Sequence, residues 1–434
     1  MLNNPERVEF TKEMRDTYTI LIPEMCEIHF RLLTGVCRHY GLNVVPLNNG
    51  SSSVINTGLK YVHNDICYPA LLVIGQMIEA LQSGKYDVHK TALMITQTGG
   101  GCRASNYIHL LRKALKKAGL EFVPVISLNL NGLEKNSGFK PSVVFLLKVL
   151  AAFNYGDLLM LLKNQTEPYE LVPGKSAEMV EKWVDILSRD INRGTHYLLY
   201  GQRRTMVKIA NDFANIPMTV EKKVKVGIVG EIYVKFSPLG NNHLEDFLRS
   251  QDCEVMIPGV MGFMYYCIVN ASNDLSLYGG SFFRRRLYAL GCRALDIYSR
   301  NISKAISRHR RFTAPAPFSE LGVLAEDIIQ NGCKMGEGWL LTSEMVELIR
   351  HGFENIVCTQ PFGCLPNHIA GRGKIREIRD KYPDANIVAI DYDPGATAVN
   401  QENRIKLMLA MAREKLAERE AKPQIAEETH ATIA

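Results

Sequence analysis

The stretch TALMITQTGGGCRASNYIHLLRKALKKAG, residues 91–119, joins three local patterns that decide the fold class. Residues 91–97 are apolar and β-prone, the glycines at 99–101 mark a turn, and residues 106–119 have helical spacing that ends at a glycine. A strand that enters a helix through such a turn is the unit of a parallel α/β sheet. In these sheets the turns line the crevice at the carboxyl ends of the strands, where ligands bind.

The same alternation of strand and helix patterns occurs on both sides of a long helical stretch at residues 141–216. Before it, strands are expected at 17–23, 42–47, 91–97 and 122–128, and after it at 224–230, 253–258, 355–360 and 386–393. We therefore predict an α/β protein with two doubly wound, Rossmann- or flavodoxin-like parallel-sheet domains. The expected boundaries are 1–140 and 221–418 for the two domains, 141–220 for a helical connector, and 419–434 for a disordered tail.

Composition indicates a globular chain with enough apolar residues for a sizeable core. Of 434 residues, 46% are hydrophobic and 22% are charged, and the net charge is +6. No run of about 18 apolar residues predicts a membrane span, and the polar start has no signal-peptide core, so we expect a cytoplasmic protein that does not bind membranes. Basic clusters at 284–286 and 309–311 have no nucleic-acid motif around them. The preferred interpretation is that these clusters are solvated helix faces, and the alternative is that they are docking or phosphate-binding patches. Nucleic acid is not expected as a partner.

Three of the ten cysteines stand out because they lie in turns marked by glycine or proline, where strands are expected to end and helices to begin. These are Cys67 in DICYPALLVIG, Cys102 in TGGGCRASNY and Cys364 in QPFGCLPNHIAG. The absence of any CxxC pair disfavours zinc ribbons and thioredoxin-like redox pairs. Three thiolates that meet in one crevice would suit a cubane iron–sulfur cluster with one iron left open for substrate.

Each cysteine also has a simpler reading as a small buried hydrophobe. Cys364 favours the ligand reading, since the prolines and glycine around it turn the backbone sharply and backbone amides tune a cluster's potential. Cys102 follows glycines that allow close approach of a bulky ligand, although GxGxxG is absent. Cys67, with Pro69 near the start of a helix, is weak evidence by itself.

Polar residues near the predicted strand ends are candidates for proton transfer and substrate contact. Glu231, at the end of VKVGIVG, would be a general base or a buried carboxylate that caps nearby amides. His368 is the second candidate for proton handling. Candidate substrate contacts are Arg103, Tyr233, Asn241 and Gln360. Asp391 and Asp393 are read as the end of a strand and the cap of the next turn rather than as metal ligands.

Taken together, six segments resemble the 2-hydroxyacyl-CoA dehydratase family over about residues 19–410. They are NDICYPALLVIGQM, GGGCRASNY, VGEIYVKFSPLGNN, EGWLLTSEMVEL, QPFGCLPNHIAGRGKIREI and IVAIDYDPG. The match is best to the dehydratase-like region of large fused acyl-CoA dehydratase activases. The resemblance implies an oxygen-sensitive [4Fe–4S] cluster on Cys67, Cys102 and Cys364, and a lyase of anaerobic metabolism.

The resemblance also implies a radical mechanism and a set of partners. One electron from an ATP-dependent activator, an ASKHA-type ATPase with its own iron–sulfur cluster, makes the acyl-CoA thioester a ketyl that expels its 2-hydroxyl group. This chain shows no ATPase half, so the activator would be a separate polypeptide. A homodimer or a heterodimer with a paralogous subunit is also expected. The alternatives are an ATP-coupled reductase of small substrates with a double-cubane cluster, and a non-catalytic protein that relays electrons.

Overall fold

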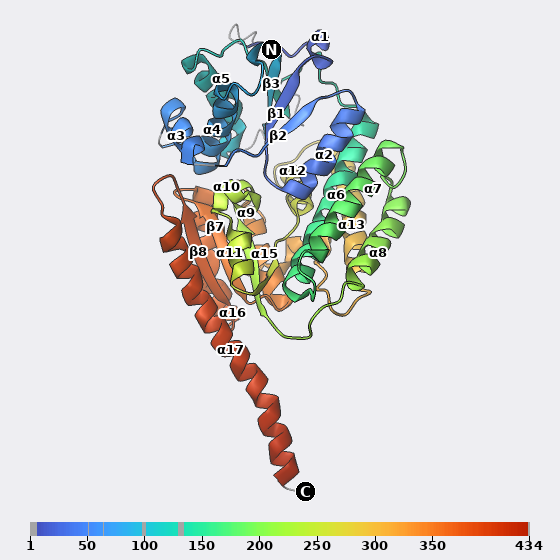
Figure 1. Ribbon diagram of the computed structural model, residues 1–434, viewed down its shortest axis with the longest axis vertical. Coiled ribbons are helices and arrows are strands. Elements are labelled where there is room, and N and C mark those ends of the chain that lie inside the picture. The colour runs from blue at the N-terminus through green and yellow to red at the C-terminus, as the bar shows by residue number, and fades with distance from the viewer. Residues whose placement is uncertain (1–6, 51, 64, 98–100, 129–133, 433–434) are drawn as a thin grey trace.

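The computed structural model describes residues 7–50, 52–63, 65–97, 101–128 and 134–432. The chain forms two four-stranded sheets in which every strand pair is parallel (Figure 1). The first sheet has the order β2-β1-β3-β4 and the second has the order β6-β5-β7-β8. The strands are β1 Thr19–Pro23, β2 Val44–Leu47, β3 Thr91–Thr96, β4 Val125–Leu128, β5 Val224–Gly230, β6 Cys253–Met256, β7 Asn355–Pro361 and β8 Asn386–Tyr392. The prediction of an α/β chain with two parallel sheets is thus confirmed.

Helices surround both sheets and make up most of the remaining chain. In the first half they are α1 Lys12–Arg15, α2 Glu27–His39, α3 Ser52–Tyr61, α4 Tyr68–Gln82 and α5 Tyr107–Lys117. Between the sheets follow α6 Val143–Thr166, α7 Lys175–Asn192 and α8 Leu199–Ala214. The second half contains α9 Ile232–Phe236, α10 Pro238–Asn241, α11 Leu244–Ser250, α12 Val260–Leu277, α13 Phe282–Ile306, α14 Phe318–Leu324, α15 Trp339–Arg350, α16 Ile375–Lys381 and α17 Ala398–Thr432.

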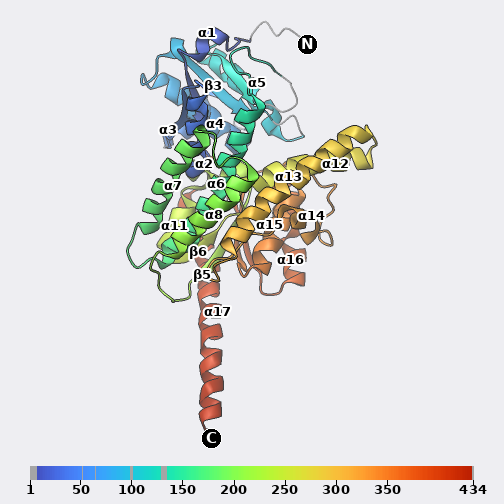
Figure 2. The ribbon, with the colours of Figure 1, turned by 90° about the vertical axis from the view of Figure 1, so that its right-hand side faces the viewer.

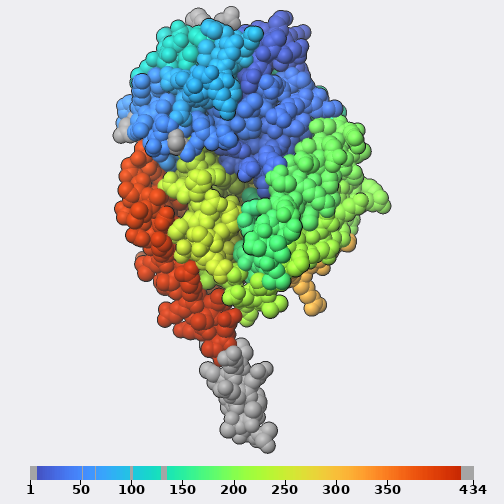
Figure 3. Space-filling view, in the orientation of Figure 1, coloured from blue at the N-terminus to red at the C-terminus, as the bar shows by residue number. Residues whose placement is uncertain are grey.

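Successive residues of the strands point into two different hydrophobic clusters, as the period of two in a strand requires. In β1, Ile20 packs in the cluster that contains α2 and α6, whereas Leu21 packs in the cluster that contains α4. In β7, Ile356 and Val357 divide between the same two clusters. Each cluster therefore runs through both sheets, and the first half of the chain lies against the second half and against α6 to α8 (Figure 3).

Two local expectations differ from the structure. The turn that carries Cys67 follows helix α3 rather than a strand, because residues 52–61 form a helix that the sequence reading did not predict. Gly58 on α3 and Gly75 on α4 explain where helix α3 packs, because the lack of side chains at both positions lets the two helices approach closely. A Cβ on Gly75 would lie 2.3 Å from the Val54 carbonyl oxygen.

The second difference concerns the segment 419–434, which was expected to be a disordered tail. In the structure, helix α17 continues into this segment and ends at Thr432. Alanine and glutamate, which favour a helix, make up seven of the segment's sixteen residues, while Pro423 opposes one. Among the described residues, one helical stretch, Val143–Tyr169, has the length and composition to cross a membrane, but 61% of its most apolar window is buried inside the protein.

Candidate cysteine site

The three predicted ligand cysteines lie at comparable positions in the fold, each at the start of a helical turn. Cys67 is the N-cap residue of α4, and Cys102 is the N-cap of the 3₁₀ turn Arg103–Asn106. Cys364 follows β7 and precedes the π-helical turn Asn367–Gly371, and the adjacent Gly363 has a φ of +71°. All three thiols are free and partly buried. Gly99 and Gly100 of the glycine turn, and Asn64 near Cys67, lie outside the described residues.

The electrostatic interactions of the thiols indicate one shared neighbourhood. A negative charge on Glu231 raises the pKa of Cys67, Cys102 and Cys364 alike, and Cys102 further raises the pKa of Cys67. Such influence requires short separations, because interactions between charges weaken with distance. The Cys102 turn and the chain before Cys67 are also in direct contact, since the Arg103 guanidinium donates to the Asp65 backbone oxygen at 2.8 Å.

A short loop before α15 holds two of these turns in place. A Cβ on Gly101 would lie 2.3 Å from the sulfur of Met335, so the glycine turn of the first sheet contacts this loop directly. On the other side, a Cβ on Gly336 would lie 3.0 Å from the ring of Pro366, and Gly336 has a φ of +59°. The loop thus sits between the Cys102 turn and the Cys364 turn, and the positive φ of Gly336 favours glycine at the second contact.

Glu337 in this loop is a functional candidate that the sequence reading missed. Its carboxylate accepts hydrogen bonds from the Ile232 amide at 3.1 Å and from Nδ2 of Asn367 at 3.2 Å. The same Nδ2 of Asn367 lies 3.4 Å from the sulfur of Cys364. No sequence pattern around Glu337 marks it as a functional residue, because a buried glutamate before an apolar helix is common. Only the fold shows that Glu337 connects α9 to the Cys364 turn through Asn367.

Glu231 caps α9 by accepting a hydrogen bond from the Val234 amide at 2.8 Å. The structure therefore shows the capping contact that was the alternative to a general base. Burial raises the pKa of Glu231, and the nearby Glu337 raises it further. Burial likewise raises the pKa of Glu337. When two carboxyl groups lie close together in a buried space, one of them keeps its proton, because two negative charges there would repel each other. A carboxyl group that exchanges protons near neutral pH needs a pKa that is raised in this way.

Burial is also the main cause of the raised thiol pKa values. It raises the pKa of Cys67 to about 11 and that of Cys364 to about 12, and it raises the pKa of Cys102 as well. The hydroxyl of Tyr107 lies 2.8 Å from the Cys67 sulfur and opposes the shift there. Without a cation beside them these thiols remain protonated at neutral pH, whereas a metal would deprotonate them.

The remaining predicted site residues divide into two groups. His368 and Gln360 both point to Asp391: Nε2 of His368 lies 3.3 Å from Oδ1, and Nε2 of Gln360 donates to the same oxygen at 2.7 Å. Arg372 adds a contact to Oδ2 at 3.3 Å. Asp391 is thus the centre of a polar group beside the Cys364 turn, while Asp393 caps the next turn by accepting from the Gly395 amide at 2.7 Å. The reading of Asp393 as a cap is confirmed.

The other group consists of side chains whose polar atoms are already used or covered. The Asn241 amide nitrogen donates to the backbone oxygens of Val234 and Lys235, so its role in the structure is to fix the turn between α9 and α11. The Arg103 guanidinium donates to the backbone oxygen of Asp65 at 2.8 Å, which ties the Cys102 turn to the chain before Cys67. Tyr233 is buried beside Glu231, which raises its pKa in addition to the effect of burial.

A metal centre at this site would be held by the three thiols. No three histidine, cysteine, aspartate or glutamate side chains lie close enough to hold one metal ion among the residues that the structure describes. Thiolate ligands of a cubane stand farther apart than ligands of one ion, because four irons and four sulfides lie between them. Thiols on three separate turns are the donors that would hold such a cluster.

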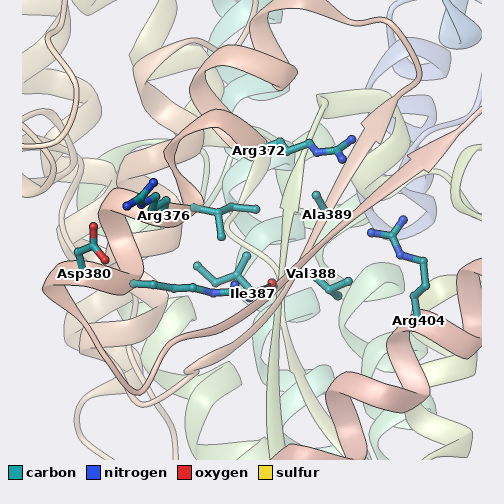
Figure 4. A pocket seen from close by; sticks show the side chains of 9 residues that line it. Arg372, Arg376, Asp380, Ile387, Val388, Ala389 and Arg404 are labelled. Atoms are coloured by element: carbon teal, nitrogen blue, oxygen red, sulfur yellow. Dashed lines mark hydrogen bonds between the residues drawn. The ribbon is translucent and has the colours of Figure 1, made fainter.

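A separate groove follows the outer edge of β8, where the strand has no neighbour in the sheet (Figure 4). It has a volume of about 560 Å³. Its basic residues are Arg372, Arg376, Arg379 and Arg404. Arg379 donates to the backbone oxygen of Ile387 at 2.6 Å, so part of this charge covers the open edge of the sheet.

Comparison with known proteins leaves the family resemblance as an expectation. No protein-family model matches the chain, and no curated protein matches it.

Proposed function

We propose that Cys67, Cys102 and Cys364 hold a [4Fe–4S] cluster at which a 2-hydroxyacyl-CoA is dehydrated. The observation that carries the proposal is that direct contacts connect the three cysteine turns. The loop before α15 meets the Cys102 turn and the Cys364 turn, and Tyr107, which follows the Cys102 turn, lies 2.8 Å from the Cys67 sulfur. Three thiolates leave one iron without a protein ligand, and an open position is what allows a bound metal to act on substrate. When bound, the cluster would supply the single electron that the radical dehydration requires.

The side chains around the thiols would place the substrate and move its protons. Glu231 and Glu337 share a buried space, and the carboxylate that is ionised there would accept the proton lost from the substrate. Phe362 and Leu365 are 67% and 69% exposed beside Cys364, and they would form an apolar rim that covers the acyl chain and excludes water. His368, which lies beside Asp391 and the fully buried Gln360, would contact polar groups of the substrate from the other side of this turn.

The finer description of the fold belongs to the same proposal. Each sheet has the strand order 2-1-3-4 in its own numbering, which agrees with the flavodoxin-like order in which ligands bind between the first and third strands. Glu231 follows β5 and Cys364 follows β7, the two central strands of the second sheet. We therefore propose two doubly wound domains at 1–140 and 221–418, with the connector at 141–220 between them, in a cytoplasmic protein.

The donor set is equally compatible with two other roles. A reductase of small substrates with a double-cubane cluster would use the same cysteines, and so would a protein that only relays electrons. Dehydration is favoured over electron relay because Glu231 and Glu337 provide a site for proton transfer, which electron relay does not need.

Iron content tests the cluster first. We expect about four irons and four sulfides per chain after anoxic purification and reconstitution, with an EPR signal on one-electron reduction. Cys67→Ser, Cys102→Ser and Cys364→Ser should each lose most of the iron, whereas Cys267→Ser and Cys292→Ser, on α12 and α13, should keep it. Full iron content in the first three variants would refute the assignment.

Turnover then separates the candidate reactions. The loaded protein alone should not dehydrate a 2-hydroxyacyl-CoA, but it should do so when an ATP-dependent activator and ATP are added. Sustained dehydration without ATP would favour ordinary acid–base elimination. Reduction of small substrates without dehydration would favour the reductase, and neither reaction would favour electron relay.

A further inference from the structure

The hairpin of α12 and α13 projects from the side of the molecule (Figure 2), and its end carries large apolar side chains in solvent. Six of them are between 58% and 78% exposed. They are Leu277, Tyr278, Phe282, Phe283, Leu287 and Leu290. Contiguous apolar surface of this kind on a folded protein marks a site of interaction.

The apolar residues of α13 form a stripe with a regular spacing. Phe283, Leu287, Leu290, Ala294 and Ile297 follow one another at intervals of four, three, four and three residues. This is the a/d pattern by which one helix packs against another. The stripe is not the contact with α12, because Gly291 and Leu295 lie on that side: a Cβ on Gly291 would lie 3.6 Å from Ile268, and Leu295 is buried.

Positive charge runs along one edge of the stripe. Arg286, Arg293 and Arg300 recur at intervals of seven residues, so they occupy one flanking position of the same repeat. Arg300 already pairs with Asp296 at 2.7 Å, but Arg286 and Arg293 have no carboxylate partner among the residues that the structure describes. No acidic residue occurs between positions 275 and 295.

We propose that this α13 stripe binds an amphipathic helix of a partner protein, one with apolar residues at heptad spacing and acidic residues beside them. Glutamates in the flanking positions would pair with Arg286 and Arg293, while the apolar residues pack on Phe283, Leu287 and Leu290. The proposal does not depend on the cluster chemistry.

Charge is the reason for choosing a different protein over a second copy of this chain. In an antiparallel symmetric pair the Arg286–Arg293–Arg300 edge would face itself. In a parallel pair the Arg284–Arg286 runs would lie at the same level. Both arrangements bring like charges together, which an acidic partner avoids.

Binding of two designed helices to the full chain tests the proposal. The probes are fluorescent four-heptad peptides with leucine at positions a and d, one with glutamate and one with lysine at positions e and g. We expect the glutamate peptide to bind at least tenfold more tightly in fluorescence anisotropy, with an affinity that falls as salt is raised from about 50 to about 300 mM. Leu287→Glu with Leu290→Glu should weaken binding at least tenfold, whereas Leu407→Glu, at an exposed leucine on α17, should not.

A charge-reversal variant separates loss of binding from loss of folding. Arg286→Glu with Arg293→Glu should exchange the preference, so that the lysine peptide binds more tightly. Equal binding of both peptides, or binding of neither, would overturn the proposal. So would concentration-dependent dimers in light scattering that disappear with Leu287→Glu, or Leu287-dependent co-sedimentation with vesicles of phosphatidylcholine and phosphatidylserine.

Discussion

At the scale of single residues, the Glu231–Glu337 pair stands out because the buried carboxyl group of Glu337 lies close to a second one on the partly buried Glu231. Glu231 bonds the Val234 amide, and Glu337 bonds the Ile232 amide and Asn367. Backbone and amide donors stabilise one negative charge in this space, but a second would be opposed by the first. The pair therefore holds a proton at a pH at which separate glutamates would have lost theirs.

Replacing Glu231 by Gln tests whether this proton is used. The side-chain oxygen of the introduced amide can still accept from Val234, and the like charge is gone, so we expect stability in urea to stay the same or to rise by about 1 kcal/mol. Iron content should be unchanged, whereas turnover of the activated protein should fall at least a hundredfold if Glu231 is the base. Loss of iron and solubility together would show a structural role instead.

At the scale of elements, Asp157 on α6 joins two helices from different halves of the chain. Its carboxylate accepts from the amides of Val260 and Met261 at the start of α12, at 2.8 and 3.0 Å, and contacts Nε2 of His29 on α2 at 2.8 Å. Gly259 permits this approach, because a Cβ there would lie 2.4 Å from the carboxylate. Asp157 therefore sets where α12, and with it the projecting hairpin, begins.

Asp157→Ala should destabilise the protein by about 3 kcal/mol, since it leaves two helix amides and the His29 ring without their buried partner. Asp157→Asn keeps an acceptor and should cost about half as much. Chemical unfolding in urea measures both, with Asp185→Ala at an exposed position of α7 as the control. An effect of Asp157→Ala no larger than that of the control would contradict a joining role.

At the scale of the whole molecule, several glutamates are buried in the second half, and they make stability depend on pH. Glu347 on α15 accepts from the Ala316 amide, and burial raises its pKa to about 8. Between its ordinary value of 4.5 and 8 the folded state holds a proton that the unfolded state has lost. Raising the pH through this range therefore favours unfolding.

We expect the free energy of unfolding to fall between about pH 5 and 8, with Glu347 contributing up to about 1.4 kcal/mol per pH unit. Glu347→Gln should make this dependence less steep and should raise stability at pH 8 relative to the wild type. Buried Glu344 acts in the same direction, so some slope will remain. Urea titrations at several pH values provide the measurement, and an unchanged slope in the variant would show that Glu347 ionises normally.

The sequence by itself determined the eight strands, the long helical segment between the sheets and the turns that carry Cys102 and Cys364. These features depend on apolar periodicity, glycine and proline within a few residues of each other, so local order in the chain is enough to reveal them. Helix α3 was missed because its serines and asparagine resemble a loop, and it forms by packing on Gly75 of α4.

Only the tertiary structure decided what surrounds the cysteines. Glu337 reaches the Ile232 amide across 105 positions of sequence, and Met335 meets Gly101 across a still longer interval. The tertiary structure also decided that Asn241 donates hydrogen bonds to backbone oxygens and that His368 and Gln360 both contact Asp391. The exposure of the α13 stripe to solvent was decided in the same way. Such contacts arise from how the two sheets and their helices pack, and packing between distant segments leaves no pattern in neighbouring residues.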